Sequence, residues 1–578
     1  MKIPMLCRNI AILACLSLAV APAFGQNTVV SNNNPATFSS AVAAGGTVTF
    51  AFNGTITLTN TIVVTNNVLV DATGYNITIS GGSNLQIFIV NSNASLALNN
   101  LTLANGNYVW VINSLPYISS YGGAINNGGS LVITGCTFSN NAANASFAIG
   151  DAGRGRGGAI FNEGSLVVSN SFFLQNSARG NDGFEMSNPV GAEGSGGAIY
   201  NAGTALIANC SFFSNTAAAG NGQSSTGQGG NGGPAYGGAI CTVGTLALFN
   251  STFLQNASIG GSGAGGFQVS GEGSQPYGGG NGGAGNGGAV CSVSGNSIII
   301  NSTFANNLAE GSGAGAGGGG IDAGSFSDNP NGANGGNGGN GIGGGISLFA
   351  GALSLTNVTC VNNVATGGLG GAGGGASQYP YGSANGANGV PGVGQGDTIG
   401  NAGGTFFVKN SIVYCAAEGT NGFGSIFDAG NNINSDATDL FTNSTSYNNT
   451  NPLLGTLGNY GGPTQTVPLL LGSPAINAAD PLAFPPTDQR GYPRPSGSAP
   501  DIGAFEYTYP TLSGILAGHG GIQIVLTSDF GSTAILEISS NLIIWSPLST
   551  NLIATGPTVI SDATATNANR RFYRVIAK

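Results

Sequence analysis

The chain has 578 residues, with 12 Lys and Arg against 22 Asp and Glu, a net charge of −10 and only 6% charged residues. Soluble proteins average about 25% charged residues, so this is not the composition of an ordinary cytosolic enzyme, and the shortage of cations argues against nucleic acid as a partner. With 41% hydrophobic residues the chain is also too apolar to be disordered throughout, despite its 104 Gly.

The first 25 residues have the pattern of a secretory signal peptide. Lys2 and Arg8 precede an apolar run at 10–20, and Ala23 and Gly25 are the small residues of a cleavage site before Gln26. A lipoprotein signal acylated at Cys15 is the alternative. No apolar run of 18 residues follows, so the sequence predicts no transmembrane helix. The expected location is outside the cell.

Residues 35–107 precede the regular part of the sequence. Residues 35–44 (PATFSSAVAA) lack alternation and predict a short helix. Residues 47–107 alternate between apolar and polar side chains in stretches such as GTITLTNTIVVTNNVLV, as strands do. We interpret this region as the less regular first coils of a solenoid. The helix would cover the otherwise unpaired edge of the first coil.

A 22-residue repeat then decides the fold. The repeated pattern is Gly-Gly-Ala-Ile, an Asn/Gly turn, an alternating stretch and Phe-x-x-Asn, and the last two units are one residue longer. The units open at Gly122, Gly157, Gly196, Gly237, Gly287 and Gly343. Each unit holds three short strands that cannot bury an apolar face alone, so the units must stack. The predicted fold class is all-β: a right-handed parallel β-helix followed by a small C-terminal β-sandwich.

Stacking places equivalent residues over one another. Five Phe residues are predicted to form a column that ends at Cys360: Phe138, Phe173, Phe212, Phe253 and Phe304. Six Asn residues are predicted to form an amide ladder at a corner with left-handed backbone: Asn141, Asn176, Asn215, Asn256, Asn307 and Asn363. The paired Gly residues that open each unit are predicted to need positive φ. Both motifs are interpreted as structural.

The two tetrapeptides carry a family resemblance. GGAI at 157–160 and Phe-x-x-Asn at 173–176 resemble the repeats of polymorphic outer membrane proteins, and the match covers six coils. The resemblance implies a β-helical surface adhesin. Those proteins end in a transmembrane β-barrel, whereas the ending ANRRFYRVIAK does not match one, so the resemblance does not extend to autotransport.

Insertions of 13, 17, 19, 28, 33 and 37 residues separate the units, and the last runs from Thr366 to Ala402. Because all leave from one point of the repeat, we expect a single flank. Their Gly, Asn and Ser content fits disorder, and it equally fits loops ordered by stacking that form a ligand-binding surface. Calcium-binding repeats of the form Gly-Gly-x-Gly-x-Asp need a carboxylate ligand in each repeat, and the insertions contain few Asp, so calcium binding is rejected. No Lys lies between Lys2 and Lys409 to support a phosphate loop.

Six Cys remain after the signal peptide. Cys241 and Cys291 share a repeat position in adjacent coils, within reach of a disulfide. Stacked parallel side chains do not guarantee the required torsion, so buried free thiols are the favoured interpretation. Cys136 and Cys210 also share a register, with Ser171 in the coil between them.

An enzyme is the rival interpretation, since parallel β-helices include polysaccharide lyases and hydrolases. Such chemistry needs paired carboxylates, and Glu163 stands alone in its register. The nearest candidate is a patch of insertion residues, more simply explained as solvated charges: Asp151, Arg154, Arg156, Arg179, Asp182, Glu185 and Glu193. The single His519 has no partner carboxylate nearby in the sequence. We therefore assign no catalytic, cofactor-binding or metal-binding residue, and no cofactor.

The sequence changes character after residue 450. NPLLGTLGNYGGPTQTVPLLLGSPAIN, TDQRGYPRP and DIGAFE at 451–506 resemble the choice-of-anchor Q domain of bacterial surface proteins. Asp488, Asp501 and Glu506 are predicted to surround Arg490 and pin this segment onto the last coil, with a cation site as the alternative. Residues 508–578 alternate as strands of a small sandwich that resembles fibronectin-like modules. Trp545 and Tyr573 are predicted to lie in its core, with platforms for stacking sugars as the alternative.

The predicted organisation is a signal peptide (1–25), a parallel β-helix with Gly/Asn-rich insertions (26–450), a choice-of-anchor Q-like closing segment (451–507) and a fibronectin-like sandwich (508–578). The expected function is that of a secreted bacterial cell-surface adhesin or structural protein. Its expected partner is a polysaccharide, cell-surface or matrix ligand, with no nucleic acid. The alternative function is a β-helical polysaccharide lyase or glycoside hydrolase. The sequence leaves the oligomeric state open.

Overall fold

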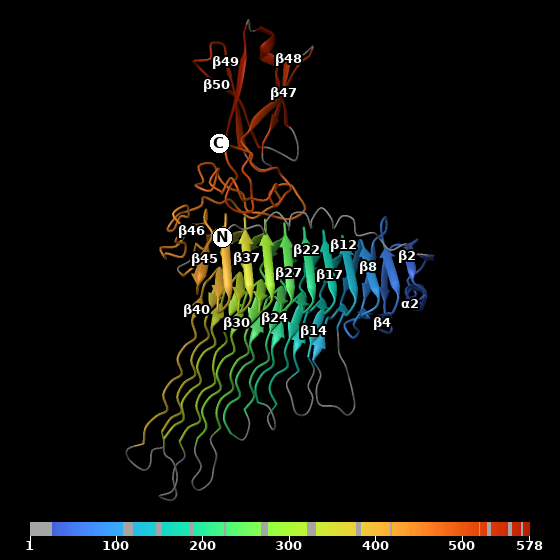
Figure 1. The fold of residues 1–578 in the computed structure, drawn as a ribbon, viewed down its shortest axis with the longest axis vertical. Helices are drawn as coiled ribbons and strands as arrows, with labels where there is room; N and C mark the ends of the chain where they lie inside the picture. The colour runs from blue at the N-terminus through green and yellow to red at the C-terminus, as the bar shows by residue number, and fades with distance from the viewer. Residues whose placement is uncertain are drawn as a thin grey trace, which may run out of the picture.

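The computed structural model describes residues 26–107, 119–145, 153–184, 189–224, 227–267, 276–320, 331–376, 383–416, 419–518, 521–528, 533–552, 558–567 and 570–577. Its body is a parallel β-helix, and small antiparallel sheets follow at the C-terminal end (Figure 1). The predicted fold class is therefore confirmed. The predicted signal peptide at 1–25 lies outside the described residues.

The coil that opens at Gly157 shows the repeated arrangement. It contains β15 (Gly155–Arg156), β16 (Ile160–Asn162), β17 (Ser165–Ser169), β18 (Phe172–Leu174) and β19 (Ser177–Arg179). Each strand pairs in parallel with the equivalent strand of the next coil, from β20 (Gly194–Ser195) to β24 (Thr216–Ala218). The coils thereby build parallel sheets of 12, 11, 10, seven and six strands.

The three largest sheets enclose the hydrophobic core. They run from β1 (Asn27–Val30) to β45 (Ile426–Asp428), from β3 (Gly54–Thr57) to β46 (Ile433–Asn434) and from β4 (Ile62–Val64) to β44 (Gly422–Phe423). Along the five-residue strands of the 12-stranded sheet, such as β17, buried side chains alternate with more exposed ones, whereas short strands such as β16 are buried at every position. This alternation is the period of two that identified the strands in the sequence.

Helix α2 (Pro35–Ala44) covers the first coil, as predicted. The Asn34 side chain caps its N-terminus by accepting a hydrogen bond from the Ala36 N–H at 2.9 Å. Phe38 is fully buried and its ring centroid lies 6.0 Å from that of Phe50 and 6.4 Å from that of Phe88. The helix therefore seals the end of the core.

The predicted Phe column is confirmed. Successive ring centroids lie 4.6 to 4.8 Å apart and the ring planes are within 6° of parallel, from Phe138 to Phe304. All five rings are fully buried. The next coil places Cys360 over Phe304, which ends the column as expected.

The predicted amide ladder is also confirmed. Each Asn side chain donates from Nδ2 to Oδ1 of the next Asn at 2.8 to 3.0 Å, from Asn141 to Asn363. The prediction that these Asn residues adopt left-handed backbone is wrong. The left-handed residue is the one before each of them, such as Gln175 with φ 53° and Ser214 with φ 52°. The ladder residue points inward and stays buried, so the turn is made one position earlier.

Only the first Gly of each opening pair has positive φ, between 62° and 68°. The second Gly is needed because a β-carbon there would overlap backbone of neighbouring coils, as at Gly197. A seventh coil opens at Gly396 with φ 68°, where Asp397 replaces the second Gly. Its strand β41 (Ile399–Asn401) pairs with β36 (Ile346–Leu348). The last insertion therefore ends before Gly396, and the predicted end at Ala402 is wrong.

The C-terminal sandwich consists of two antiparallel sheets. One contains β47 (Thr511–Gly518), β48 (Gly521–Thr527) and β51 (Thr558–Asp562), and the other β50 (Ser546–Leu552), β49 (Thr533–Ser539) and β52 (Phe572–Ala577). Ile524 and Leu526 of the first sheet share a core with Ala534 and Leu536 of the second. Tyr573 packs against this core, whereas Trp545 is half-buried beneath the Arg574 guanidinium.

A buried ionic cluster organises the segment after residue 450. Arg490 pairs with Asp488 through Nε and Nη2, each at 2.8 Å, and lies between the rings of Tyr492 and Phe505. Glu506 pairs instead with Arg494, at 2.9 Å. Both ion pairs are completely buried. The prediction that all three acids surround Arg490 is therefore wrong, because Arg494 takes part and holds Glu506.

The segment lies along the side of the β-helix rather than on its last coil alone. Gln489 exchanges hydrogen bonds with Thr252 at 2.9 Å and Thr303 at 2.6 Å, and the Ala504 N–H donates to Thr359 at 2.9 Å. These Thr residues belong to β28 (Thr252–Leu254), β33 (Thr303–Ala305) and β38 (Thr359–Val361) of three successive coils. The predicted pin to the last coil is therefore corrected to a brace across several coils.

The cluster makes stability depend on pH. Burial, followed by the charge of Glu506, raises the pKa of Asp501 from 3.8 to about 7. The folded chain thus holds a proton that the unfolded chain has lost, and this contribution to stability disappears as the pH rises through about 7. Burial also raises the pKa of Glu506, which adds to this loss of stability with rising pH.

We expect the melting temperature to fall between about pH 5 and about pH 8. Asp501→Asn removes the titrating carboxyl group and is expected to make this fall in melting temperature smaller. An equal slope in both proteins would contradict this assignment.

Candidate functional site

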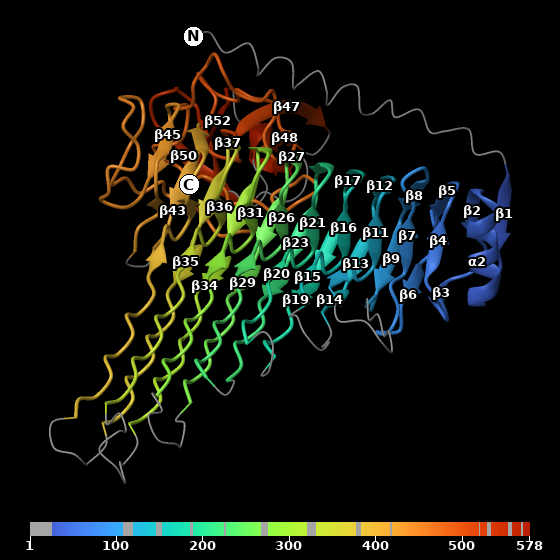
Figure 2. The same ribbon diagram turned by 60° about the horizontal axis from the view of Figure 1, so that its bottom comes forward.

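The insertions form a single flank, as predicted. They leave from the two smallest sheets of the β-helix, which run from β14 (Ala142–Asn144) to β39 (Val364–Thr366) and from β10 (Ser120–Tyr121) to β40 (Gly394–Gln395). The longer insertions extend side by side away from the β-helix (Figure 1, Figure 2). We call their described parts the glycine layer. It has outgoing segments 219–224, 260–267, 311–320 and 367–376, and returning segments 227–234, 276–284, 331–340 and 383–393.

Backbone hydrogen bonds in the glycine layer repeat every three residues. In the triplet 337–339 the three N–H groups donate to the Asn281 side chain at 2.8 Å, to the Val390 carbonyl at 2.9 Å and to the Ser312 carbonyl at 2.9 Å. Three residues earlier, the N–H groups of Gly335 and Gly336 donate in the same way to the carbonyls of Ala387 and Gly315. A three-residue period without helical or strand pairing is that of polyproline II helices. The insertions are ordered by their neighbours, so the hypothesis of disorder is wrong for the described segments.

Glycine is required in this layer because the segments approach backbone to backbone. A β-carbon at Gly339 would overlap the carbonyl oxygen of Gly283, and one at Gly392 would overlap that of Gly339. Neither Gly339 nor Gly392 has left-handed φ. The requirement is therefore for space rather than for an unusual backbone conformation. Collagen imposes the same requirement at its crowded axis.

The last loop differs from the inner loops where it faces outward. The hydrogen bonds between the last two returning segments align Asn388 of the last loop with Gly335 of the preceding loop, and Pro391 with Gly338. In the inner loops a further segment packs against these positions, so only glycine fits. The last loop has no such neighbour among the described residues, and larger side chains are tolerated there.

Two Asn side chains of the last loop accept hydrogen bonds from backbone N–H groups at the free edge of the glycine layer. The Asn388 side chain accepts from the Gly373 N–H at 2.8 Å, and Asn385 accepts from the Ala376 N–H at 2.8 Å. In the inner loop the equivalent N–H of Gly317 donates to a carbonyl of the next loop. Asn side chains of the last loop thus replace the carbonyls of a missing neighbour.

Asn residues present a regular set of amide donors on the returning segments. The Oδ1 atoms of Asn231, Asn281 and Asn337 accept from a backbone N–H of the next coil at 2.7 to 2.9 Å. Asn334 and Asn340 do the same at 2.9 Å. Because Oδ1 faces a donor, the amide NH₂ is the group left for a ligand. Each side chain is held in place by the scaffold, so these donors are preorganised.

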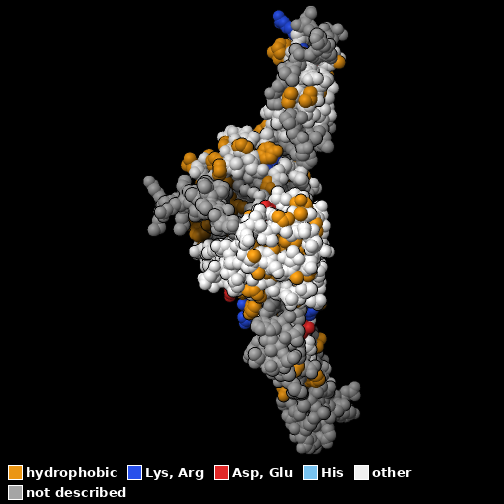
Figure 3. All heavy atoms as spheres, turned by 90° about the vertical axis from the view of Figure 1, so that its right-hand side faces the viewer, with side chains coloured by type: hydrophobic (Ala, Val, Ile, Leu, Met, Phe, Trp, Pro, Cys, Tyr) orange, Lys and Arg blue, Asp and Glu red, His pale blue; other side chains and the backbone are white. Residues whose placement is uncertain are grey.

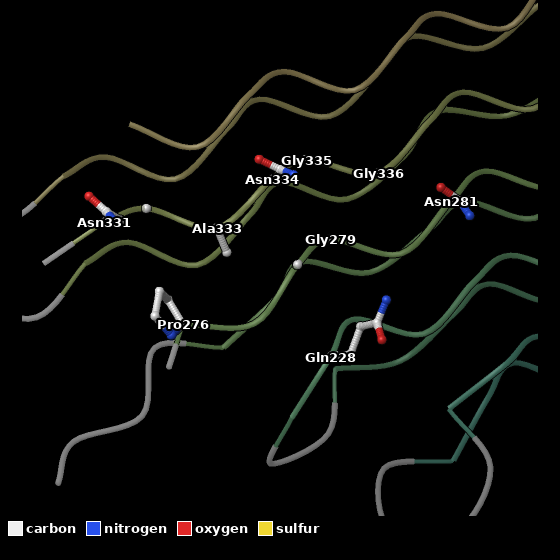
Figure 4. Close-up of a pocket in the computed structure, with 11 residues that line it drawn as sticks. Gln228, Pro276, Gly279, Asn281, Asn331, Ala333, Asn334, Gly335 and Gly336 are labelled. Atoms are coloured by element: carbon white, nitrogen blue, oxygen red, sulfur yellow. The ribbon is translucent and has the colours of Figure 1, made fainter. Parts of the chain in front are cut away.

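Two hollows lie on this face and share Asn281. The outer hollow has a volume of about 520 Å³ and lies between Gln228, Pro276 and the Asn residues 331 and 334 (Figure 4). The inner hollow, which we call the root pocket, has a volume of about 380 Å³ and lies where the layer joins the β-helix. Its wall includes Tyr236 and Phe349, whose ring centroids lie 5.7 Å apart in an edge-to-face arrangement. Among the described residues that line both hollows there is no acidic or basic side chain.

The charged patch has a structural arrangement. Glu193 accepts from Arg156 Nε at 2.6 Å, and the Arg156 guanidinium lies 4.8 Å above the Tyr200 ring. Asp182 lies 3.4 Å from Arg179. Glu163 is exposed in a turn. The described carboxylates Asp182 and Glu193 are thus each paired with Arg rather than with a second acid.

Three residues that the sequence analysis considered as catalytic candidates lie outside the described residues: Asp151, Glu185 and His519. Within the described part of the chain, no group of three or more His, Cys, Asp or Glu side chains is placed to hold a metal ion. The cation site considered for the Asp488 cluster is instead filled by the two guanidinium groups. Of the helices that the structure describes, none is long and apolar enough to span a membrane.

The six described Cys residues are free thiols. Cys241 and Cys291 are stacked partners in adjacent coils, and both are buried. Burial raises the pKa of Cys291 to about 12 and that of Cys241 well above its usual value. The favoured interpretation of buried free thiols is therefore confirmed, and such thiols have little nucleophilic thiolate at neutral pH.

The described surface visible in Figure 3 carries few Lys, Arg, Asp or Glu side chains, as the composition predicts. Recognition through such a surface must depend on hydrogen bonds and shape more than on charge. The structure thus shows a parallel β-solenoid with asparagine ladders and a neutral, ordered flank. No protein-family model matches the chain, and no curated protein matches it.

Proposed function

We propose that this protein is a secreted bacterial surface adhesin that contacts its partner through the glycine layer. The observation that carries the proposal is the ordered face of outward amide donors on the returning segments. A rigid, uncharged donor array suits an uncharged partner rich in oxygen acceptors, such as a glycan or a matrix polymer. The resemblance of the GGAI and Phe-x-x-Asn repeats to surface adhesins supports the same function.

The remaining parts of the chain are consistent with a surface location. The leader-like residues 1–25 favour export, and the likeness of 451–506 to a choice-of-anchor Q domain favours attachment after export. The β-helix would hold the glycine layer away from the surface. The rival lyase or hydrolase has no comparable support, since the described acids of its candidate patch are paired with Arg.

A matched variant tests the proposed contact face. Asn281→Asp, Asn334→Asp and Asn337→Asp together keep the oxygen that accepts from the next coil and replace each outward NH₂ by a carboxylate oxygen. We expect the triple variant to keep its fold by circular dichroism and to lose binding to cells and to immobilised matrix and glycan preparations. Undiminished binding by the folded variant would refute the glycine layer as the contact face.

The salt dependence of binding gives a second test. Because the face has no charged side chains among its described residues, raising the salt from about 0.05 M to about 0.5 M is expected to change affinity less than about threefold. Surface plasmon resonance at both concentrations measures the effect. A steep loss of affinity would instead show that charges elsewhere on the chain carry the contact.

A further inference from the structure

The root pocket contains an unsatisfied polar atom. Asn286 lines this pocket and is only 1% exposed. Its Nδ2 donates to the Ala235 carbonyl at 3.0 Å, whereas its Oδ1 has no hydrogen-bond partner. A buried acceptor without a donor costs free energy, so such atoms are rare unless a ligand or water completes them. Asn286 therefore marks a place where a donor from outside is required.

The rest of the wall supplies the complementary groups. Asn281, Asn337 and Asn340 line the same pocket, and each Oδ1 is occupied by a backbone N–H, which leaves the NH₂ groups as donors. Tyr236 and Phe349 add an aromatic wall. The volume of about 380 Å³ is within the range of small-molecule sites.

Hydroxyl groups match this combination best. A hydroxyl both donates and accepts, so one ligand can donate to Asn286 Oδ1 and accept from the neighbouring amides. Aromatic rings accept the C–H face of a sugar, and the absence of acidic or basic side chains among the described lining residues leaves a charged group without a partner. We propose that the root pocket is a binding site for an uncharged sugar unit of a polysaccharide, an inference that rests on the proposed adhesive function and names its ligand class.

Oligosaccharide titration tests this site. The probes are hexamers of cellulose, xylan, laminarin and chitin, with hexagalacturonate as the charged comparison, measured by isothermal titration calorimetry on the mature chain. We expect at least one neutral hexamer to bind and Asn286→Ala to weaken its affinity by about tenfold or more. Ser347→Ala serves as the control because Ser347 also has a buried, unpaired oxygen but does not line the pocket. The control is expected to bind like the unmodified protein.

Each other outcome is decisive. Binding of none of the neutral hexamers, or equal affinity in Asn286→Ala, overturns the sugar site. If Asn286→Ala fails to fold, Tyr236→Ala in the aromatic wall replaces it, and unchanged affinity in that variant overturns the site equally. If no neutral hexamer binds, or Asn286→Ala leaves the affinity unchanged, while the protein still attaches to cells, the sugar site is refuted but the adhesive function stands. Sugar binding without any attachment to cells does the reverse.

Discussion

Replacing Arg490 with Ala is expected to lower the free energy of unfolding by about 3–5 kcal/mol, because it leaves the Asp488 carboxylate buried without its cation. The guanidinium also donates to the Glu506 carbonyl at 2.6 Å and fills the space between Tyr492 and Phe505. The loss therefore combines an unpaired charge with a cavity. Thermal and urea unfolding followed by circular dichroism measure it.

Two further variants define the cause. Arg490→Lys retains the charge but not the planar fork, so we expect an intermediate loss. Arg570→Ala removes an exposed Arg from the sandwich and is expected to leave stability within about 0.5 kcal/mol of the original. The root pocket is lined by other residues, so sugar binding by the folded Arg490→Ala protein should be unchanged. Unchanged melting of Arg490→Ala would show that the cluster does not brace the coils.

Replacing Phe212 with Ala is expected to have an effect of similar size, about 3–5 kcal/mol. Phe212 is fully buried in the middle of the column, and its ring lies 4.7 Å from that of Phe173 and 4.6 Å from that of Phe253. The substitution removes both ring contacts and leaves a cavity that the rigid coils cannot close. Urea unfolding of the original and substituted proteins gives the difference in stability.

The neighbouring Phe213 supplies a matched control. It lies on the same strand, β23 (Ser211–Phe213), but points outward and is 36% exposed. Phe213→Ala should therefore lower the free energy of unfolding by well under half as much as Phe212→Ala does. Equal losses for Phe212→Ala and Phe213→Ala would show that inward stacking contributes nothing beyond ordinary contact area.

Features that recur in every unit could be predicted from the sequence. Stacking places each copy of a residue over the last, so a recurring Phe or Asn becomes a column once the units pair in parallel. The same reasoning identified the helix at 35–44 by its lack of alternation. It failed at the seventh coil, where Asp397 replaces the second Gly and hides the motif.

The glycine layer could not be predicted with the same certainty. Glycine-rich composition is typical of both flexible linkers and close-packed polyproline II segments, and only contacts between loops distinguish them. A local signal was present in the three-residue spacing of Asn331, Asn334, Asn337 and Asn340, which matches the period of the hydrogen bonds.

No repeated spacing in the sequence indicates the root pocket. Asn286 and Tyr236 occupy single positions that adjacent coils do not repeat, since Ile342 follows Asn286 in the register. Their role depends on which loops lie beside them. Arg494 was missed for a similar reason, because its pairing with Glu506 is set by the course of an irregular segment.

The Asn and Pro residues on the outward side of the last loop have a consequence for molecules crowded together. An open rim of backbone donors would recruit the glycine-rich loops of another molecule and propagate into fibres. With Asn385 and Asn388 occupying donors and Pro391 lacking an N–H, this growth has no starting point. We therefore expect the glycine layer to end at the last loop of each chain, so that copies at high concentration remain separate molecules.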